Sequence, residues 1–145
     1  MKRYNLRVYA IIINQRNEIL LSSEHRHGQS FTKFPGGGIH WGEGTADALN
    51  RELVEELGCD FNVGEIFYVN DFFQVSAFNN EDQLISFYYH ALPSDESNLA
   101  KLHLKKGANG DGEMFHWKSL NELKEADLTF PIDKIVAKRL ISRMI

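Results

Sequence analysis

The stretch RELVEELG (residues 51–58) has the pattern of a helix end and places three carboxylates within five residues. They belong to Glu52, Glu55 and Glu56, which are neighbours on a helix because they lie three and four positions apart. Like charges at this spacing cost about 0.2–0.5 kcal/mol per pair, and the C-terminal end of a helix is already negative. Arg51, four residues before Glu55, relieves part of this repulsion. A divalent cation would remove the rest, and a solvated acidic face is the plain alternative.

The helix that contains this stretch is predicted to begin near Gly44 or Thr45, with Thr45 as a candidate N-cap, and to end at Gly58. Its core-facing stripe is predicted from helical spacing to be Ala46, Leu49, Leu53 and Leu57. A run of three glycines at 36–38 precedes it. Glycine permits backbone angles that other residues avoid and leaves room for a close approach.

The composition predicts one domain spanning residues 1–145, because the chain has 145 residues and 43% of them are hydrophobic. The net charge of −4 argues against a nucleic acid polymer or an anionic membrane as partner. The single cysteine, Cys59, cannot form an intrachain disulfide, which predicts a reducing, cytoplasmic compartment. We find no signal peptide and no apolar run long enough to span a membrane.

The strands are predicted from runs of β-branched and aromatic residues. They cover residues 5–14, 18–23, 31–35, 60–78, 83–92 and 113–117, the first two as a hairpin. Segments 93–98 and 105–112 are predicted loops, 119–126 a short helix, and Pro131 the start of a last helix. A mixed sheet with one helix inserted after the third strand and further helices at the end indicates an α/β (α+β) sandwich.

The stretch GGIHWGEGTADALNRELVEELGC (residues 37–59) resembles the sequence box of the Nudix hydrolases. That box has a glycine, then Glu after five residues, and after seven more Arg-Glu-aliphatic, any residue, Glu-Glu, any residue and Gly-aliphatic. Gly37, Glu43 and the run from Arg51 to Gly58 fill these positions. The one departure is Cys59, where the family prefers a bulkier aliphatic residue.

The resemblance implies a Nudix-type mixed sheet between helices and a hydrolase that acts on phosphorus-containing acid anhydrides. It also implies a cofactor, Mg²⁺ or Mn²⁺, held by Glu52, Glu55 and Glu56. Arg51 would orient these carboxylates through charge-assisted hydrogen bonds. The chemistry is sound, because magnesium prefers oxygen ligands and usually keeps positions open for water and substrate phosphate.

Three further box residues are assigned to the cofactor site by the resemblance. Gly37 and Gly38 would let the backbone pack against the catalytic helix, and Glu43 would brace the loop or join the metal network. The homodimer that many Nudix proteins form is expected here by resemblance only.

The general base is left open between the box residues Glu55 and Glu56 and the more distant Glu113. Glu113 follows a glycine-rich loop and precedes an apolar strand. It is therefore either a base or additional ligand, or an exposed residue at the start of a strand. Lys33 and Arg26 are candidates for contacts with substrate phosphate, with solvated loop charges as the alternative.

The expected substrate is a small diphosphate compound, a nucleoside diphosphate linked to a further group, with a nucleoside triphosphate as first choice. ADP-ribose or a nucleotide sugar is the alternative substrate. A non-catalytic nucleotide-sensing domain is an alternative from another class, but such domains usually lose box carboxylates, and all are retained here. An isoprenoid diphosphate isomerase is disfavoured, because Cys59 ends the box helix and is expected to be buried, which makes it a poor catalytic cysteine.

Overall fold

The computed structural model describes residues 1–26, 28–105 and 112–143, so most of the predicted loop at 105–112 lies outside the described residues. The described strands are β1 Arg3–Ile11, β2 Glu18–Arg26, β3 Gln29–Lys33, β4 Gly36–Gly38, β5 Phe61–Val69, β6 Asp82–Pro93 and β7 Met114–Ser119. The helices are α1 Thr45–Leu57 and α2 Pro131–Ser142, with 3₁₀ helices η1 Glu96–Leu104 and η2 Glu125–Asp127. No helix in these ranges is long and apolar enough to span a membrane.

The strands form two sheets, whereas the sequence predicts one mixed sheet. The four-stranded sheet has the order β4-β1-β6-β5, and the three-stranded sheet has the order β3-β2-β7. β1 pairs with β6 in parallel and with β4 in antiparallel orientation, so the four-stranded sheet is mixed as predicted. The predicted hairpin is reduced to one antiparallel bridge between Ile13 and Ile19, after which its strands enter different sheets.

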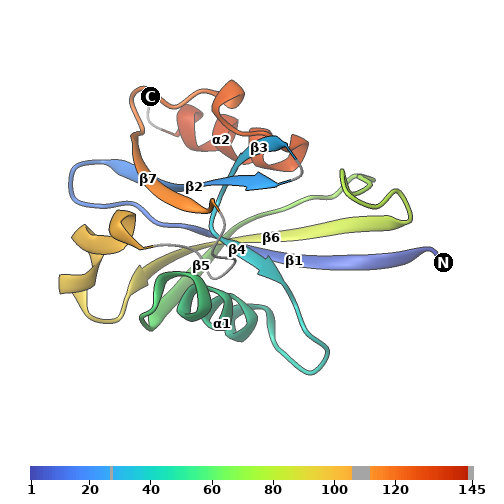
Figure 1. Cartoon of the computed structure of the whole chain (residues 1–145), viewed down its shortest axis with the longest axis horizontal. Helices are drawn as coiled ribbons and strands as arrows, with labels where there is room; N and C mark the ends of the chain where they lie inside the picture. The colour runs from blue at the N-terminus through green and yellow to red at the C-terminus, as the bar shows by residue number, and fades with distance from the viewer. Residues whose placement is uncertain (27, 106–111, 144–145) are drawn as a thin grey trace.

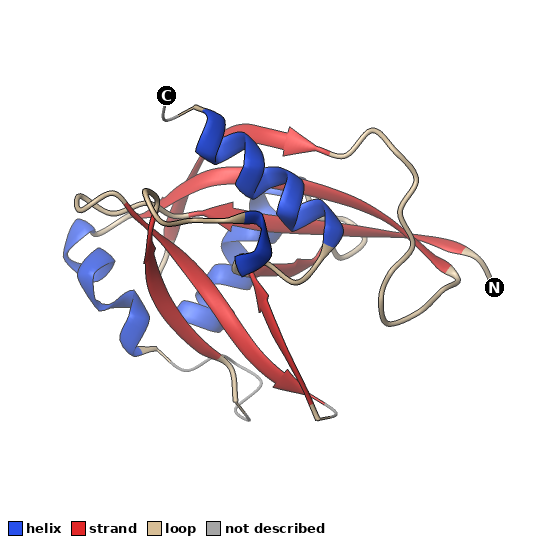
Figure 2. Cartoon of the chain, turned by 90° about the horizontal axis from the view of Figure 1, so that it is seen from above, coloured by secondary structure: helices blue, strands red, loops and turns tan. Residues whose placement is uncertain are grey.

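The helices cover the four-stranded sheet from opposite sides, with α1 on one side and α2 on the other (Figures 1 and 2). On the α2 side, Asp133 accepts from the Tyr88 hydroxyl of β6, and Arg139 lies over the Tyr68 ring of β5. The predicted helix α1 is present, and it ends at Gly58, whose left-handed φ of 76° lets its N–H bond to Val54. Gly44 is the N-cap in place of Thr45, whose hydroxyl bonds to Tyr89. The buried face of α1 is Ala48, Leu49, Leu53 and Leu57, so the predicted stripe is wrong at Ala46, which is exposed.

Asn70 interrupts the strand that the sequence predicts over residues 60–78. β5 ends at Val69, and the buried Asn70 side chain takes the place of a neighbouring backbone. Its Oδ1 accepts from the backbone N–H of Ser86 at 2.8 Å, and its Nδ2 donates to the carbonyl oxygen of Leu84 at 3.1 Å. Pairing resumes at a bridge between Val75 and Gln83. One side chain thus replaces a rung of the β ladder at the edge of β6.

Replacing Asn70 by alanine is expected to lower the free energy of unfolding by about 2–3 kcal/mol, because buried backbone groups of β6 would lose their partners. Urea denaturation measures this change. Asn80→Ala, at an exposed turn position, is the matched control and should change stability by less than about 0.5 kcal/mol. Equal midpoints for the two variants would contradict the role of Asn70.

Two other predictions differ from the structure near the C-terminus. The segment predicted as a loop at 93–98 leads into the 3₁₀ helix η1, which Asp95 caps by accepting from the backbone N–H of Ser97. The prediction of a short helix at 119–126 is wrong, because β7 extends to Ser119 and the next helical segment, η2, begins only at Glu125. The last helix begins at Pro131 as predicted.

Candidate active site

Arg51 connects the glycine strand, the following loop and the acidic helix. Its Nε and Nη2 donate to the two carboxylate oxygens of Glu43 at 2.6 and 3.0 Å, and Nη2 also donates to the carbonyl oxygen of Gly38 at 2.9 Å. Its Nη1 donates to Glu52 Oε1 at 3.1 Å and to Glu55 at 3.3 Å. Arg51 therefore orients two of the predicted carboxylate ligands, and Glu43 braces the loop against the helix.

The charges of this network reinforce one another. The hydrogen bonds from Arg51, followed by one from the backbone N–H of His40, lower the pKa of the Glu43 carboxyl to about 2. The same bond with Glu43 is the main cause that raises the pKa of Arg51. Both groups stay ionised at neutral pH, so the brace is a permanent ion pair.

Gly37 of β4 is required by the position of Glu52. A Cβ built on Gly37 would stand 2.5 Å from the Glu52 carboxyl group, closer than real Cβ atoms approach. Gly36 is equally constrained, because its φ is 149° and a Cβ there would collide with the carbonyl oxygen of Val8. The glycine run thus brings strand β4 against the carboxylates of α1.

Glu56 carries a polar atom that the protein does not satisfy. Among the described residues, its Oε2 is the only buried side-chain oxygen or nitrogen without a hydrogen-bond partner. Burial is the main cause that raises the pKa of Glu56 to about 8, and the carboxylates of Glu113 and Glu52 add to it, whereas Lys33 acts in the opposite direction. An enclosed carboxylate oxygen of this kind is positioned for a cation.

Glu113, the residue just before β7, is buried, with 3% of its surface exposed. Its Oε2 accepts from the hydroxyl of Ser22 at 2.8 Å and lies 3.9 Å from Lys33 Nζ. The alternative of an exposed strand-entry residue is therefore wrong. Lys33 is no solvated loop charge either, because its side chain is only 12% exposed. Burial opposes the charge of Lys33, but Glu56 and other neighbours outweigh it and raise its pKa.

The predicted ligands fit a magnesium-type ion in part. Glu52 and Glu56 offer hard oxygen donors, and among the described residues only Glu56 Oε2 is a buried side-chain oxygen without a hydrogen-bond partner. Glu55 differs, because its side chain is half exposed and bonded to Arg51. In the described ranges, no three His, Cys, Asp or Glu side chains form a cluster that could hold a metal ion. One or two carboxylates completed by water and substrate oxygens are the usual magnesium arrangement.

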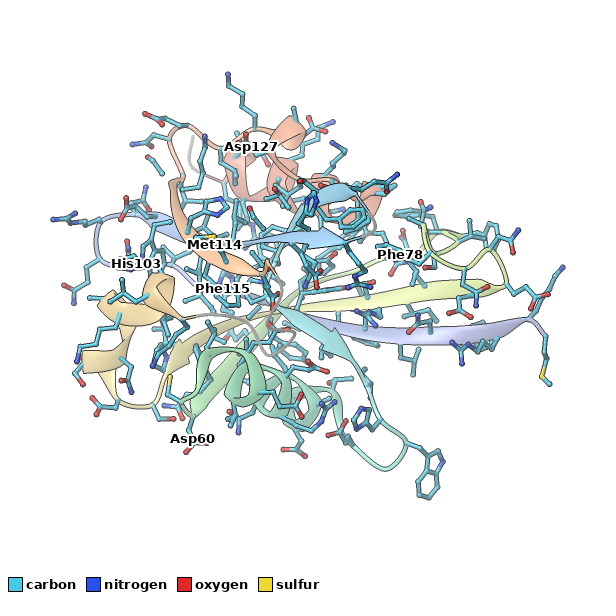
Figure 3. The ribbon with its side chains drawn as sticks, viewed as in Figure 1. Asp60, Phe78, His103, Met114, Phe115 and Asp127 are labelled. Carbon is cyan, nitrogen blue, oxygen red and sulfur yellow. The ribbon has the colours of Figure 1, made fainter. Side chains whose placement is uncertain are left out.

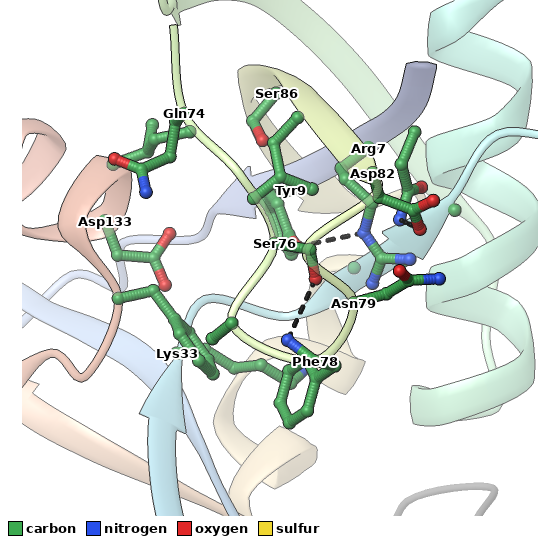
Figure 4. A pocket seen from close by; sticks show the side chains of 18 of the residues that line it. Arg7, Tyr9, Lys33, Gln74, Ser76, Phe78, Asn79, Asp82, Ser86 and Asp133 are labelled. Atoms are coloured by element: carbon green, nitrogen blue, oxygen red, sulfur yellow. Dashed lines mark hydrogen bonds between the residues drawn. The ribbon is translucent and has the colours of Figure 1, made fainter. Parts of the chain in front are cut away.

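A cleft of about 700 Å³ lies beside these carboxylates, and the side chains around it come from both sheets (Figure 4). Alternate residues of β1 line it, namely Arg3, Asn5, Arg7 and Tyr9. Phe78, which Figure 3 labels, packs on Phe31 of β3 and on Phe130. Its ring centroid is 5.3 Å from that of Phe31 and 5.7 Å from that of Phe130. Arg26 lies over the Phe78 ring at 5.3 Å and pairs with Glu24 at 3.0 Å.

Arg7 is a site residue that was not among the predicted ones; it is partly buried in β1 and reaches the cleft. Its Nε donates to the Tyr9 hydroxyl at 3.1 Å. Burial opposes its charge, but Tyr9, Glu52 and Glu56 outweigh burial and raise its pKa. The sequence does contain a signal, namely an arginine inside the apolar run NLRVYAIII (residues 5–13). Burying an arginine is costly unless it has a partner or a ligand.

Asp133 and Tyr88 line the cleft as a buried pair, 2% and 1% exposed. The Tyr88 hydroxyl donates to Asp133 Oδ1. Burial is the main cause that raises the pKa of the Asp133 carboxyl to about 6. Figure 4 shows Asp133 among the side chains that line the cleft.

This pair predicts a pH dependence of stability. The folded-state pKa of Asp133, about 6, exceeds its ordinary value of 3.8, so folding favours the protonated form. The resulting stabilisation is complete below pH 3.8 and is lost as the pH rises through about 6. Asp133→Asn should therefore gain stability relative to wild type between about pH 4 and pH 7, on the order of 3 kcal/mol. If the unfolding free energies of wild type and Asp133→Asn change in the same way with pH across this range, the prediction is contradicted.

Fold and site together define a two-sheet α+β domain with a carboxylate-rich helix and a glycine strand beside a polar cleft. The model of the NUDIX domain matches residues 3–139. The chain therefore belongs to the NUDIX family, as the sequence box indicates.

Solved structures and curated relatives agree with this family. A MutT structure from work on Aliivibrio salmonicida and Vibrio cholerae has 25% identity and a TM-score of 0.66, covering 97% of this chain and 99% of its own. MutT of Methanosarcina mazei, at 21% identity and a TM-score of 0.73, covers 99% and 96% and shares the fold. An RNA pyrophosphohydrolase of Hamiltonella defensa is 44% identical over 55 residues, which are 38% of this chain and 32% of the relative. The chain thus matches about a third of that relative's length.

Proposed function

We propose that the protein is a metal-dependent pyrophosphohydrolase that cleaves a diphosphate linkage in a nucleoside diphosphate derivative, with a nucleoside triphosphate as first candidate. The observation that carries the proposal is the unsatisfied Glu56 Oε2, enclosed beside Glu52 at a cleft that also holds Arg7 and Lys33. Carboxylates and cations in one cleft suit a metal together with a phosphate.

The residues divide the work of this reaction. Glu52 and Glu56 would hold Mg²⁺ or Mn²⁺, while Arg51 fixes Glu52 and Glu55 in orientation. When bound, the metal would polarise the phosphate and lower the pKa of a water molecule. Lys33 offsets the negative charge that a diphosphate brings into the cleft. Glu113 joins the box carboxylates as a candidate general base, because it is buried and lines the same cleft.

Hydrolysis of a substrate panel tests the proposal. The panel contains nucleoside triphosphates, ADP-ribose, nucleotide sugars and an RNA with a 5′-triphosphate, with Mg²⁺ or Mn²⁺. The RNA is included because several relatives are named RNA pyrophosphohydrolase. We expect release of a nucleoside monophosphate and pyrophosphate from a nucleoside triphosphate, of a nucleoside monophosphate and a sugar phosphate from ADP-ribose or a nucleotide sugar, or of pyrophosphate from the RNA. Tight nucleotide binding without any release would contradict the proposal and favour a sensing domain.

A further inference from the structure

The four Lys and Arg side chains that line the described cleft differ in their partners. Arg3 pairs with Asp82 at 2.7 Å, Arg26 with Glu24 at 3.0 Å, and Lys33 lies 3.9 Å from Glu113. In the described ranges, Arg7 has no carboxylate within ion-pair distance, and its only hydrogen bond is to the Tyr9 hydroxyl. Its terminal nitrogens are therefore free to bind another acceptor.

Strand pairing places this guanidinium beside the glycine run. Arg7 stands opposite Gly38 in the β1–β4 register, and a Cβ on Gly38 would be 3.3 Å from Arg7 Nη1. The preceding glycine, Gly37, leaves room for the Glu52 carboxyl group. Successive residues of a strand face opposite sides of the sheet, so the guanidinium and the carboxylate approach β4, an edge strand, from opposite sides. Arg7 and Glu52 both line the cleft, so a ligand that passes this edge would contact both.

The charges around Arg7 favour an anionic ligand that binds together with a metal ion held by Glu52 and Glu56. A positive charge removed from water and left without a bonded counter-ion is costly. Glu52 and Glu56 act on Arg7 only at a distance, and a cation bound to them would reduce that attraction. A planar guanidinium with free Nη donors matches the oxygens of a phosphate group, to which it can donate two parallel hydrogen bonds.

We propose that Arg7 binds a phosphate group of the substrate on the cleft side of the glycine strand, and that Tyr9 holds the guanidinium in position. This inference rests on the proposed function, since it names the residue that grips the diphosphate opposite the carboxylates of α1. Tyr9 is suited to the role because its ring stacks on the buried Tyr88 at 5.2 Å, which fixes the hydroxyl that accepts from Arg7 Nε.

Binding of inorganic pyrophosphate in the presence of Mg²⁺, measured by calorimetry, tests the assignment without requiring turnover. Arg7→Gln should weaken pyrophosphate binding by about 10- to 100-fold, the range for a charged hydrogen bond. Arg7→Lys, which keeps the charge and loses the fork, should lie between this variant and wild type. Tyr9→Phe should weaken binding by about threefold, as expected for a lost neutral hydrogen bond. Arg16→Gln removes an equal charge from the exposed β1–β2 turn and should bind as wild type.

A role limited to neutralising the acidic helix gives a different pattern. In that case Arg7→Gln would change the affinity for Mg²⁺ alone and leave pyrophosphate binding unchanged, which would overturn the proposal. Failure of the wild-type protein to bind pyrophosphate would overturn it as well. Thermal melting identifies any variant that has not folded. If Arg7→Gln does not fold, the pyrophosphate affinity of Arg7→Lys tests the proposal instead.

The two proposals fail in distinguishable ways. Suppose that the wild-type protein cleaves no member of the substrate panel, but that Arg7→Gln binds pyrophosphate more weakly than wild type. The phosphate site is then supported and the hydrolase proposal is refuted. If wild type hydrolyses a substrate and Arg7→Gln has unchanged kcat/KM and pyrophosphate affinity, the hydrolase stands and the role of Arg7 is refuted.

Discussion

Replacement of Glu56 by glutamine is expected to lower kcat by about a thousandfold, the equivalent of ~4 kcal/mol of transition-state stabilisation. Glutamine has nearly the same shape but carries no charge to hold a divalent cation at the enclosed Oε2 position. The measurement is steady-state hydrolysis of the best substrate of the panel at saturating Mg²⁺.

The stability of this variant separates a catalytic effect from unfolding. In EDTA, Glu56→Gln should melt at or above the wild-type temperature, because a neutral amide is less costly to bury than a carboxylate. Glu122→Gln, at an exposed position, is the matched control and should keep wild-type activity. Undiminished turnover by Glu56→Gln would remove this residue from the metal site.

Replacement of Gly37 by alanine is expected to lower kcat/KM by about a hundredfold, the loss that a displacement near 1 Å can cause. The new Cβ would stand 2.5 Å from the Glu52 carboxyl group, so either this carboxylate or strand β4 must shift. The effect should appear in activity and in Mn²⁺ affinity, since Glu52 is a proposed ligand.

Gly44→Ala provides the matched comparison, because it makes the same chemical change in the loop before α1. Its backbone φ is −72°, and the nearest atom to an added Cβ is Asp47 Oδ2 at 3.5 Å, an ordinary contact. This variant should keep wild-type kcat/KM. Equal activity for the two alanine variants would show that the fit between Gly37 and Glu52 is not needed.

Sequence reasoning predicts the local features of this fold well. Helix α1 and its end at Gly58 follow from the leucine spacing and from the need for glycine at a left-handed φ. The contact between Arg51 and Glu55 follows from helix geometry alone, and it is present at 3.3 Å. These features depend on residues close in the chain, so a single sequence carries enough information.

The features that the sequence does not reveal depend on distant contacts. The hydrogen bonds of Asn70 join it to Leu84 and Ser86 of β6, which lie 14 and 16 residues further along the chain. The buried Glu113 contacts Ser22 and Lys33, which lie near the other end of the chain. The division into two sheets likewise follows from the parallel pairing of β1 with β6. No local pattern encodes such pairings, although the arginine at position 7 of an apolar strand was a readable sign.

The assignment of roles within the acidic helix remains a set of predictions, because the structure arranges its three glutamates unequally. Arg51 bonds to Glu52 and Glu55, and Glu56 alone keeps an enclosed oxygen without a partner in the described ranges. We therefore expect Glu52 and Glu56 to contribute more to metal affinity than Glu55. The homodimer expected by resemblance also remains a prediction.

Titration of Mn²⁺ followed by electron paramagnetic resonance tests the central claim, that these carboxylates form a divalent-cation site, most directly. We predict saturable binding to wild type, a loss of at least tenfold in affinity for Glu52→Gln and for Glu56→Gln, and a smaller loss for Glu55→Gln. Wild-type affinity in both Glu52→Gln and Glu56→Gln, or no saturable binding to wild type, would contradict the account.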